Sequence, residues 1–258
     1  MARSTNLNLL KDYLPQLLVN EKTKPASHYK RLIRFFQLRN PNQLVIAILQ
    51  FVFRLFKGRF TYLILDATTW QVGQRPVHLL TLCLLLDNTA IPLYWLQLAK
   101  KGHSSQVERQ ELIRQALQLY RLQGKILLAD RAYIDQQWLA YLCQSGIDFV
   151  IRLPEGCYPI ALSEAPEPAY RRKRGVMKAF TLQGFCVSMV IIKNPKDDLD
   201  QPLLYFLSSL THKVKISEAY RLGWPIETCF KHLKTQGFNL ENLTFKEDGK
   251  IMLVVAMV

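Results

Sequence analysis

Three acidic residues stand where their carboxylates could act together. Asp66 and Asp130 each follow a short apolar run, residues 60–65 and 126–129, of the kind found in central strands buried on both faces. The carboxyl ends of such strands form the edge at which open α/β sheets hold their ligands. If the two strands are neighbours in the sheet, the two carboxylates lie side by side.

Glu227 is the third acidic residue, in a stretch, residues 220–238, that reads as a helix ending at Gly237. A helical period places three polar side chains on the face of Glu227, those of Tyr220, Lys231 and Lys234. A neighbouring apolar stripe is formed by Ile226, Phe230 and Leu233. The simpler interpretation is a surface helix with an ion pair between Glu227 and Lys231.

Clustered carboxylates have a definite metal preference. Oxygen ligands without imidazole or thiolate suit a hard cation such as Mg²⁺. Two such ions about 3.5–4 Å apart can activate a nucleophile and stabilise a leaving oxygen at a phosphodiester. If the helix of Glu227 packs across the edge that carries Asp66 and Asp130, the sequence predicts such a site. Taken singly, each aspartate leaves a second interpretation open, as the cap of a helix or turn.

The chain is strongly basic. Its 258 residues include 34 Lys and Arg against 20 Asp and Glu, a net charge of +14. This excess favours a polyanionic partner, nucleic acid first and an anionic membrane surface second. Basic residues gather in the first 57 residues and in one later run, Arg171, Arg172, Lys173 and Arg174. Both groups could contact phosphates or simply form a solvated face.

Cysteines and apolar runs bear on where the protein works. The five cysteines are far apart and never in a C-x-x-C pair, which favours neither a disulfide framework nor a zinc cluster. The first residues lack the pattern of a signal peptide. The longest apolar runs, residues 44–56 and 77–86, are interrupted or too short to cross a bilayer. We therefore expect a soluble cytoplasmic protein without a membrane partner.

The hydrophobic pattern divides the chain into four regions. Residues 1–57 read as helices, with Pro41 starting the last of them, and are expected to bind DNA. Residues 58–153 carry the strands and helices of an α/β core. Residues 154–209 are first rich in proline and then β-like, which indicates an inserted β region. Residues 210–258 complete the core, and their apolar end predicts either a buried helix or an element cut in its middle.

The elements of the core are specified by local signals. Strands are predicted at residues 60–65, 77–86, 91–98, 126–129 and 148–153, with a tight turn at residues 87–90. One helix starts at a cap, Ser104 or Ser105, and runs to about Tyr120. Its predicted inner side consists of Val107, Leu112, Ile113 and Leu117. A second helix covers residues 135–145, with Trp138, Leu139 and Leu142 inward.

Five motifs follow one another in the chain. They are LDATTW at residues 65–70, IPLYW at 91–95, LADR at 128–131, FVIRL at 149–153, and residues 224–241 with WPIETCF and LKTQGFNLE. Together they resemble the DDE transposases of bacterial insertion sequences, within these the insertion-sequence-four group. The resemblance covers about residues 60–245 and implies a ribonuclease-H-like α/β fold. Such a fold has a mixed sheet flanked by helices, here with a β region inserted before Glu227 and a helical N-terminal region.

Carried onto this sequence, the resemblance makes Asp66, Asp130 and Glu227 the catalytic residues and the ligands of two Mg²⁺ ions, with Mn²⁺ as a substitute. The residues that we expect to contact DNA are Tyr220, Lys231, Lys234, Arg131, Arg152, Arg171, Arg172, Lys173 and Arg174.

The sequence departs from the group's pattern at two positions. The signature of Tyr, Arg, Glu and Lys matches at Tyr220, Glu227 and Lys234, but Gly223 stands at the arginine position. Ala132 stands where relatives often have a glutamate. With the apolar end of the sequence, these departures suggest a decayed or truncated copy.

The resemblance implies a metal-dependent transposase. It would bind the terminal inverted repeats of its element as double-stranded DNA, cleave a strand, and use the freed 3′ hydroxyl to attack target DNA. We expect a homodimer in the DNA complex, associated with the nucleoid when bound. Two alternatives stay open: a catalytically inactive DNA-binding remnant, and a stand-alone nuclease of the same core fold.

Overall fold

The chain divides into two compact units. The computed structural model describes residues 5–19, 22–37, 40–99, 102–153, 177–194, 202–212, 215–216, 218–219, 222–223, 225–243 and 247–257. One unit, called the sheet unit, comprises Phe56–Ala67 and Leu79–Ile226. The other, called the helical unit, comprises Met1–Leu55, Thr68–His78 and Glu227–Val258.

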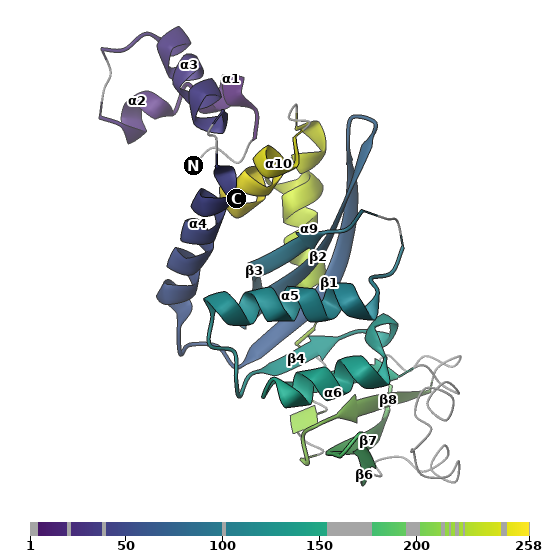
Figure 1. The fold of residues 1–258 in the computed structure, drawn as a ribbon. Coiled ribbons are helices and arrows are strands. Elements are labelled where there is room, and N and C mark those ends of the chain that lie inside the picture. The colour runs from purple at the N-terminus through teal and green to yellow at the C-terminus, as the bar shows by residue number, and fades with distance from the viewer. Residues whose placement is uncertain are drawn as a thin grey trace. The chain divides into compact units, whose positions relative to one another are not determined.

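The strands in the described part of the chain form one eight-stranded mixed sheet (Figure 1). Their order is β3-β2-β1-β4-β5-β8-β7-β6. The bounds are β1 (Tyr62–Val72), β2 (Arg75–Leu86), β3 (Thr89–Gln97), β4 (Ile126–Ala129), β5 (Asp148–Leu153), β6 (Met177–Leu182), β7 (Phe185–Lys193) and β8 (Leu203–Ser208). β4 runs parallel to both β1 and β5, and β8 runs antiparallel to β5. The predicted α/β class with a mixed sheet is confirmed.

The central strands form because their side chains are apolar on both faces. Successive residues of a strand point to opposite faces, and both members of such pairs are buried: Leu63 and Ile64 on β1, Leu127 and Leu128 on β4, and Phe149 and Val150 on β5. Such two-sided burial is typical of strands covered by helices or other layers. β4 and β5 have the predicted bounds, whereas β1 is longer than predicted and continues past Asp66 to Val72.

The hairpin between β2 and β3 is tighter than predicted. Asp87 and Asn88 both have positive φ, 45° and 65°, as a two-residue type I′ turn requires. Thr89 and Ala90, which were assigned to the turn, instead pair with Leu86 and Leu85 on β2. Asp and Asn suit the turn because their short polar side chains tolerate the left-handed conformation.

Two helices of the sheet unit pack side by side, α5 (Gln106–Leu119) and α6 (Gln136–Gln144) (Figure 1). Ser105 caps α5 in a capping box with Glu108, as one of the two predicted caps. Asp135 caps α6 by accepting the Trp138 N–H at 2.9 Å. The predicted inward residues of α6 are confirmed, since Trp138, Leu139 and Leu142 are fully buried.

The buried side of α5 differs from the prediction. It consists of Arg109, Leu112, Ile113 and Ala116, which follow the spacing i, i+3, i+4, i+7. Val107 was predicted to face inward, but 72% of it is exposed, and Leu117 is only half-buried. The prediction considered only hydrophobic residues for the inner side of α5. It therefore missed Arg109, which lies on the buried side of this helix.

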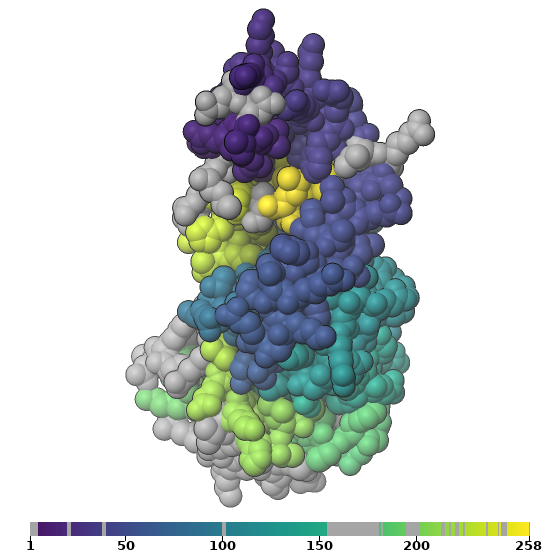
Figure 2. All heavy atoms as spheres, turned by 90° about the vertical axis from the view of Figure 1, so that its left-hand side faces the viewer, coloured from purple at the N-terminus to yellow at the C-terminus, as the bar shows by residue number. Residues whose placement is uncertain are grey.

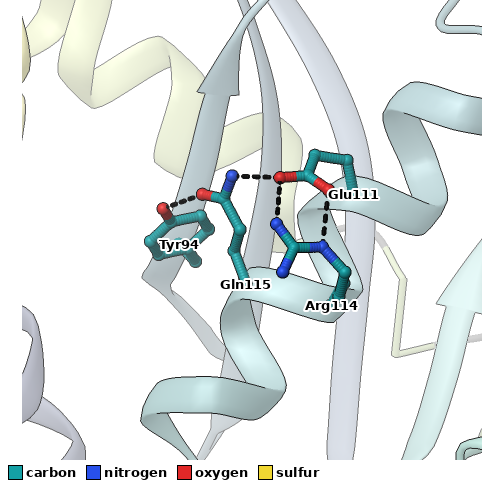
Figure 3. Close-up of polar contacts among 4 residues, drawn as sticks. All are labelled: Tyr94, Glu111, Arg114 and Gln115. Carbon is teal, nitrogen blue, oxygen red and sulfur yellow. Dashed lines mark hydrogen bonds and ion pairs between the residues drawn. The ribbon is translucent and has the colours of Figure 1, made fainter.

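The outer side of α5 is tied to β3 by a polar network (Figure 3). Tyr94 on β3 donates to the Gln115 side chain, which in turn donates to Glu111. Arg114 donates to both oxygens of Glu111, with Nε at 2.7 Å and Nη2 at 2.6 Å. The Arg114 hydrogen bond, followed by the Gln115 hydrogen bond, lowers the pKa of Glu111 to about 2.

The predicted β region extends the sheet beyond β5. β6 and β7 form a hairpin, and β7 pairs with β8, so three further strands follow β5. Ser208 at the end of β8 donates to the Phe149 carbonyl of β5 at 2.6 Å. Ser209 accepts the Phe149 N–H at 3.0 Å and donates to Asp148 at 2.7 Å. These bonds hold the inserted strands to the strand next to β4.

The helical unit contains both the first and the last helices of the described chain. Its N-terminal helices are α1 (Leu7–Leu10), α2 (Leu14–Leu17), α3 (Pro25–Phe36) and α4 (Pro41–Phe56), and α4 begins at Pro41 as predicted. The last helix, α10 (Asp248–Met257), lies against the N-terminal helices in Figure 2, where it is yellow. A Cβ on Gly249 would come 2.9 Å from Cγ of Pro41, so the two helix starts approach closely. The apolar end is helical, with Ile251, Leu253, Val254 and Val255 buried.

The stretch predicted as one helix over residues 220–238 is built differently. Its described helix, α9, spans Pro225–Lys231 and continues as a π-helical segment, His232–Gln236, that ends at Gly237. Gly223 lies in a turn before α9, not inside a helix. The predicted apolar stripe is confirmed, since Ile226, Phe230 and Leu233 are all buried. None of the helices described combines the length and the apolar character that crossing a membrane requires.

Candidate active site

The register of β1 and β4 brings two acidic residues to the same edge of the sheet. The last pair of this parallel ladder is Leu65 with Ala129. Asp66 and Asp130 are the next residues on the two strands. Paired strands lie about 4.8 Å apart, so the two aspartates follow the ladder as direct neighbours. The condition on which the two carboxylates would lie side by side, that their strands are neighbours, is therefore met.

Asp66 lies within a strand and is half-buried. The prediction that Asp66 follows the end of its strand is wrong. β1 continues to Val72, several residues beyond the end of its ladder with the short strand β4. Oδ1 of Asp66 accepts two hydrogen bonds, from the Ala67 N–H at 2.8 Å and from the Tyr133 hydroxyl at 3.2 Å. Both bonds restrict the rotation of the carboxylate.

Asp130 is exposed at the point where β4 ends. It occupies the N-cap position of a 3-10 turn, η1 (Arg131–Tyr133), but its side chain makes no capping hydrogen bond. Only its backbone carbonyl takes part in this turn, by accepting the Tyr133 N–H at 3.0 Å. Capping by the side chain therefore fails for Asp130, although its backbone occupies the N-cap position of η1.

Tyr133 joins the two acidic positions and was missed by the sequence reasoning. Only 5% of it is exposed. Burial raises the pKa of its hydroxyl, and the Asp66 carboxylate and then the Asp130 carboxylate raise it further, so Tyr133 stays a proton donor. The available signal was an aromatic residue with a polar tip three positions after Asp130, where a buried ring can still reach a carboxylate.

Arg109 packs beneath Tyr133. Its guanidinium carbon lies 6.0 Å from the centre of the Tyr133 ring and 5.9 Å from that of Trp138. Its Nε donates to the Ser105 carbonyl at 3.2 Å. Burial lowers the pKa of Arg109, and the nearby Asp135, Tyr133 and Glu108 oppose that shift.

Glu227 lies in the first turn of α9, is exposed, and belongs to the helical unit. Asp66 and Asp130 belong to the sheet unit, so the triad of all three stays a prediction. Lys231 is exposed at the end of α9. Lys234 is half-buried in the π-helical segment, where the wider turn breaks the α-helical spacing that predicted a common face with Glu227.

The other predicted DNA contacts are distributed over the chain. Arg131 is exposed directly after Asp130. Arg152 is half-buried on β5, where it pairs with Phe206 of β8. Tyr220, Arg171, Arg172, Lys173 and Arg174 lie outside the described residues.

The donor chemistry of the two aspartates fits a divalent cation. Asp66 and Asp130 offer carboxylate oxygens from adjacent strands, which are the ligands that Mg²⁺ and Mn²⁺ prefer. Within the described ranges, no group of three His, Cys, Asp or Glu side chains is close enough to hold a metal ion. The metal site of Asp66, Asp130 and Glu227 therefore stays a prediction.

Fold and site together define a class of protein. In the sheet unit, an antiparallel hairpin continues from β1 on one side and parallel β4 and β5 lie on the other, with aspartates at the β1–β4 edge. This is the ribonuclease-H-like fold. The chain belongs to the family of transposases with a DDE domain, whose model matches residues 58–257.

One solved structure agrees with this fold. The chain is similar to a piggyBac transposase in a synaptic complex with hairpin DNA, at 11% identity and a TM-score of 0.53. The match covers 98% of this chain and 60% of the piggyBac chain, so this chain spans less than two thirds of that protein. A second match is an endonuclease V from Bacillus subtilis, at 10% identity and a TM-score of 0.32, covering 73% of this chain and 84% of the other. No curated protein matches the chain.

Proposed function

We propose that this protein is a transposase of the insertion-sequence type. It binds the terminal inverted repeats of its element, cleaves a DNA strand there, and joins the freed 3′ hydroxyl to target DNA, acting as a homodimer on DNA in the cytoplasm. The observation that carries this proposal is the register that places Asp66 beside Asp130 in a chain of the DDE family. Membership of that family favours DNA as the partner and divalent metal ions as cofactors.

The metal ligands in this proposal are Asp66 and Asp130, with Glu227 of α9 as the third. A bound pair of Mg²⁺ or Mn²⁺ ions supplies activation of the attacking oxygen and neutralisation of charge on the leaving oxygen. The chain's own residues orient the ligands. Ala67 and Tyr133 fix one oxygen of Asp66, and Asp130 is exposed to solvent.

Basic residues bind the phosphates of the substrate. Arg131 stands directly after Asp130 and is exposed, so it suits a phosphate beside the reacting bond. Lys231 and Lys234 follow Glu227 on α9 and the π-helical segment. Tyr220, Arg152 and the run of Arg171, Arg172, Lys173 and Arg174 complete the set that we assign to DNA. The net charge of +14 on the whole chain also favours binding to the phosphates of DNA.

The test replaces each carboxylate by its amide, in the variants Asp66→Asn, Asp130→Asn and Glu227→Gln. The substrate is a duplex taken from the DNA that flanks the gene, with nicking and strand transfer measured in Mg²⁺ and in Mn²⁺. We expect each variant to lose cleavage by at least about 100-fold, because a metal ligand is removed. Binding measured by fluorescence anisotropy should stay within about twofold, because the phosphate contacts remain.

Asp87→Asn is the matched control. It makes the same charge change in the exposed β2–β3 turn, where asparagine also tolerates the positive φ. Full cleavage by Asp66→Asn or Asp130→Asn would contradict the assignment. Cleavage without strand transfer by the parent protein would favour a stand-alone nuclease, and binding without cleavage would favour an inactive remnant.

A further inference from the structure

A hydrogen bond between distant parts of the sheet unit holds the Asp66 carboxylate. The Tyr133 hydroxyl donates to Oδ1 of Asp66 across 67 residues of sequence, at 3.2 Å. Tyr133 is 5% exposed, so packing sets the position of its ring. The same oxygen also accepts the Ala67 N–H at 2.8 Å. A backbone donor and a side-chain donor therefore converge on a single oxygen of the carboxylate.

The Tyr133 ring packs against the charged guanidinium of Arg109, which has no role in the proposed reaction. Arg109 is 6% exposed, and its Nη1 has no hydrogen-bond partner among the described residues. Burying an incompletely paired guanidinium is costly. The Arg109 guanidinium packs against the Tyr133 and Trp138 rings, and its Nε donates to the Ser105 carbonyl at the start of α5. These contacts connect α5, η1 and α6 behind Asp66.

We propose that Tyr133 is a positioning residue for Asp66, and that Arg109 fixes the Tyr133 ring in the place from which its hydroxyl reaches the carboxylate. The proposal rests on the proposed function in so far as Asp66 is a metal ligand. A carboxylate held at one oxygen enters metal binding already ordered, so less side-chain freedom is lost on binding. Ligating carboxylates are commonly held by such outer partners, and loss of a partner typically weakens metal affinity by about 10–100-fold.

Two other roles for the hydroxyl make different predictions. A purely structural hydrogen bond would change thermal stability and leave metal affinity unchanged. A hydroxyl that competes with the metal for the lone pairs of Oδ1 would have to be displaced, so its removal would increase metal affinity. Only a positioning role predicts that removal weakens metal binding.

The experiment measures Mn²⁺ binding to the full chain by electron paramagnetic resonance of the free ion. Tyr133→Phe removes the hydroxyl and keeps the ring that Arg109 contacts. Tyr120→Phe is the matched control, because Tyr120 is 4% exposed and its hydroxyl donates to the Leu93 carbonyl at 3.0 Å, away from Asp66. We expect Tyr133→Phe to raise the Kd for Mn²⁺ by about 10–100-fold and Tyr120→Phe to change it by less than about twofold.

A double-variant cycle tests whether Tyr133 acts through Asp66. If Asp66→Asn still binds Mn²⁺ measurably, adding Tyr133→Phe to it should change the Kd by less than about twofold, because the group that Tyr133 orders is no longer a carboxylate. Arg109→Met should raise the Kd in the parent background and have no further effect in Tyr133→Phe. Equal Kd values for Tyr133→Phe and the parent, or tighter binding by Tyr133→Phe, would overturn the proposal.

A metal-free measurement separates this inference from the proposed function. The carboxyl carbon of Asp66, observed by ¹³C NMR, should shift in Tyr133→Phe and not in Tyr120→Phe, because only the first loses a bond to that carboxylate. If neither the parent nor Asp66→Asn binds Mn²⁺, the proposed metal site fails and the NMR shift alone decides the Tyr133 contact. If the parent binds Mn²⁺, Asp66→Asn does not, and Tyr133→Phe matches the parent, only the positioning role fails.

Discussion

At the scale of single residues, the two aspartates of the sheet unit are held in different ways. Asp66 is half-buried and accepts hydrogen bonds from Ala67 and Tyr133. Asp130 is exposed, and its side chain makes no capping bond to the turn that follows it. One carboxylate is therefore held by two hydrogen bonds, whereas the other is exposed to solvent. In the proposed metal site, the first would be ordered in advance and the second could adapt to the metal ion.

Arg109 provides a prediction about stability at the same scale. Arg109→Met removes a buried charge that lacks a partner on Nη1, but it also removes contacts with two aromatic rings, each worth about 0.5–2 kcal/mol. Replacing a buried ion by an apolar residue is often neutral or stabilising. We expect the free energy of unfolding to change by less than about 1 kcal/mol in urea titrations, since these effects oppose each other.

The matched control for this prediction is Arg114→Met, which changes an exposed arginine of the same helix. A loss of more than about 3 kcal/mol in Arg109→Met would show that the buried charge is essential to the fold, as for one partner of a compensated buried pair.

At the scale of secondary-structure elements, unequal strand lengths create the edge that carries the site. β1 has 11 residues and β4 has four, so their ladder ends at Leu65 while β1 continues. Asp130 leaves the sheet into η1, and Asp66 stays within its strand. The short turn η1 then returns Tyr133 to Asp66. A longer β4 would pair past Asp66 and remove this arrangement.

The network on the outer side of α5 gives a prediction about pH (Figure 3). The pKa of Glu111 is lowered to about 2 by the hydrogen bonds from Arg114 and Gln115. A carboxyl whose folded pKa is below its unfolded value stabilises the fold above the unfolded pKa. That contribution is lost as the pH falls from the unfolded value of 4.5 toward about 2. Because the pair is solvent-exposed, we expect this contribution to be small.

The measurement is a ¹³C NMR titration of the Glu111 carboxyl group. Arg114→Ala should return the pKa of Glu111 toward its usual value of 4.5, because the first cause of the shift is removed. Arg121→Ala changes an exposed arginine just beyond α5 and should leave the titration unchanged. An unchanged midpoint in Arg114→Ala would show that the ion pair of Figure 3 does not persist in solution.

At the scale of the whole molecule, the charge of +14 should dominate DNA binding. Each phosphate contact that is lost reduces the slope of log Kobs against log salt by about 0.9. If Arg171, Arg172 and Arg174 all contact phosphates, changing the three to alanine should reduce the slope by about 2.7, measured by anisotropy between low and moderate salt.

The matched control changes the same three residues to lysine. Lysine keeps the charge and binds phosphate as a point charge, so the slope should stay close to that of the parent. If the alanine variant has the same slope as the parent, the run from Arg171 to Arg174 does not contact phosphates and is a solvated face.

The amino-acid sequence by itself determined the elements that depend on local chemistry. The apolar runs of β4 and β5, a cap of α5 at Ser104 or Ser105, and the start of α4 at Pro41 were all predicted, because each depends on residues close together in the chain. The five motifs likewise led to the DDE family, which the match to residues 58–257 confirms.

Only the tertiary structure decided which of these elements meet. The pairing of β1 with β4 joins residues more than 60 positions apart, and no local period encodes it. The bond from Tyr133 to Asp66 depends on that pairing, and so does the burial of Arg109 against two rings from neighbouring elements. The π-helical segment after α9 also escaped prediction, because the sequence pattern of a helix does not show where a single turn widens. Local propensity specifies where strands and helices begin, whereas the positions of the functional side chains depend on packing between segments distant in sequence.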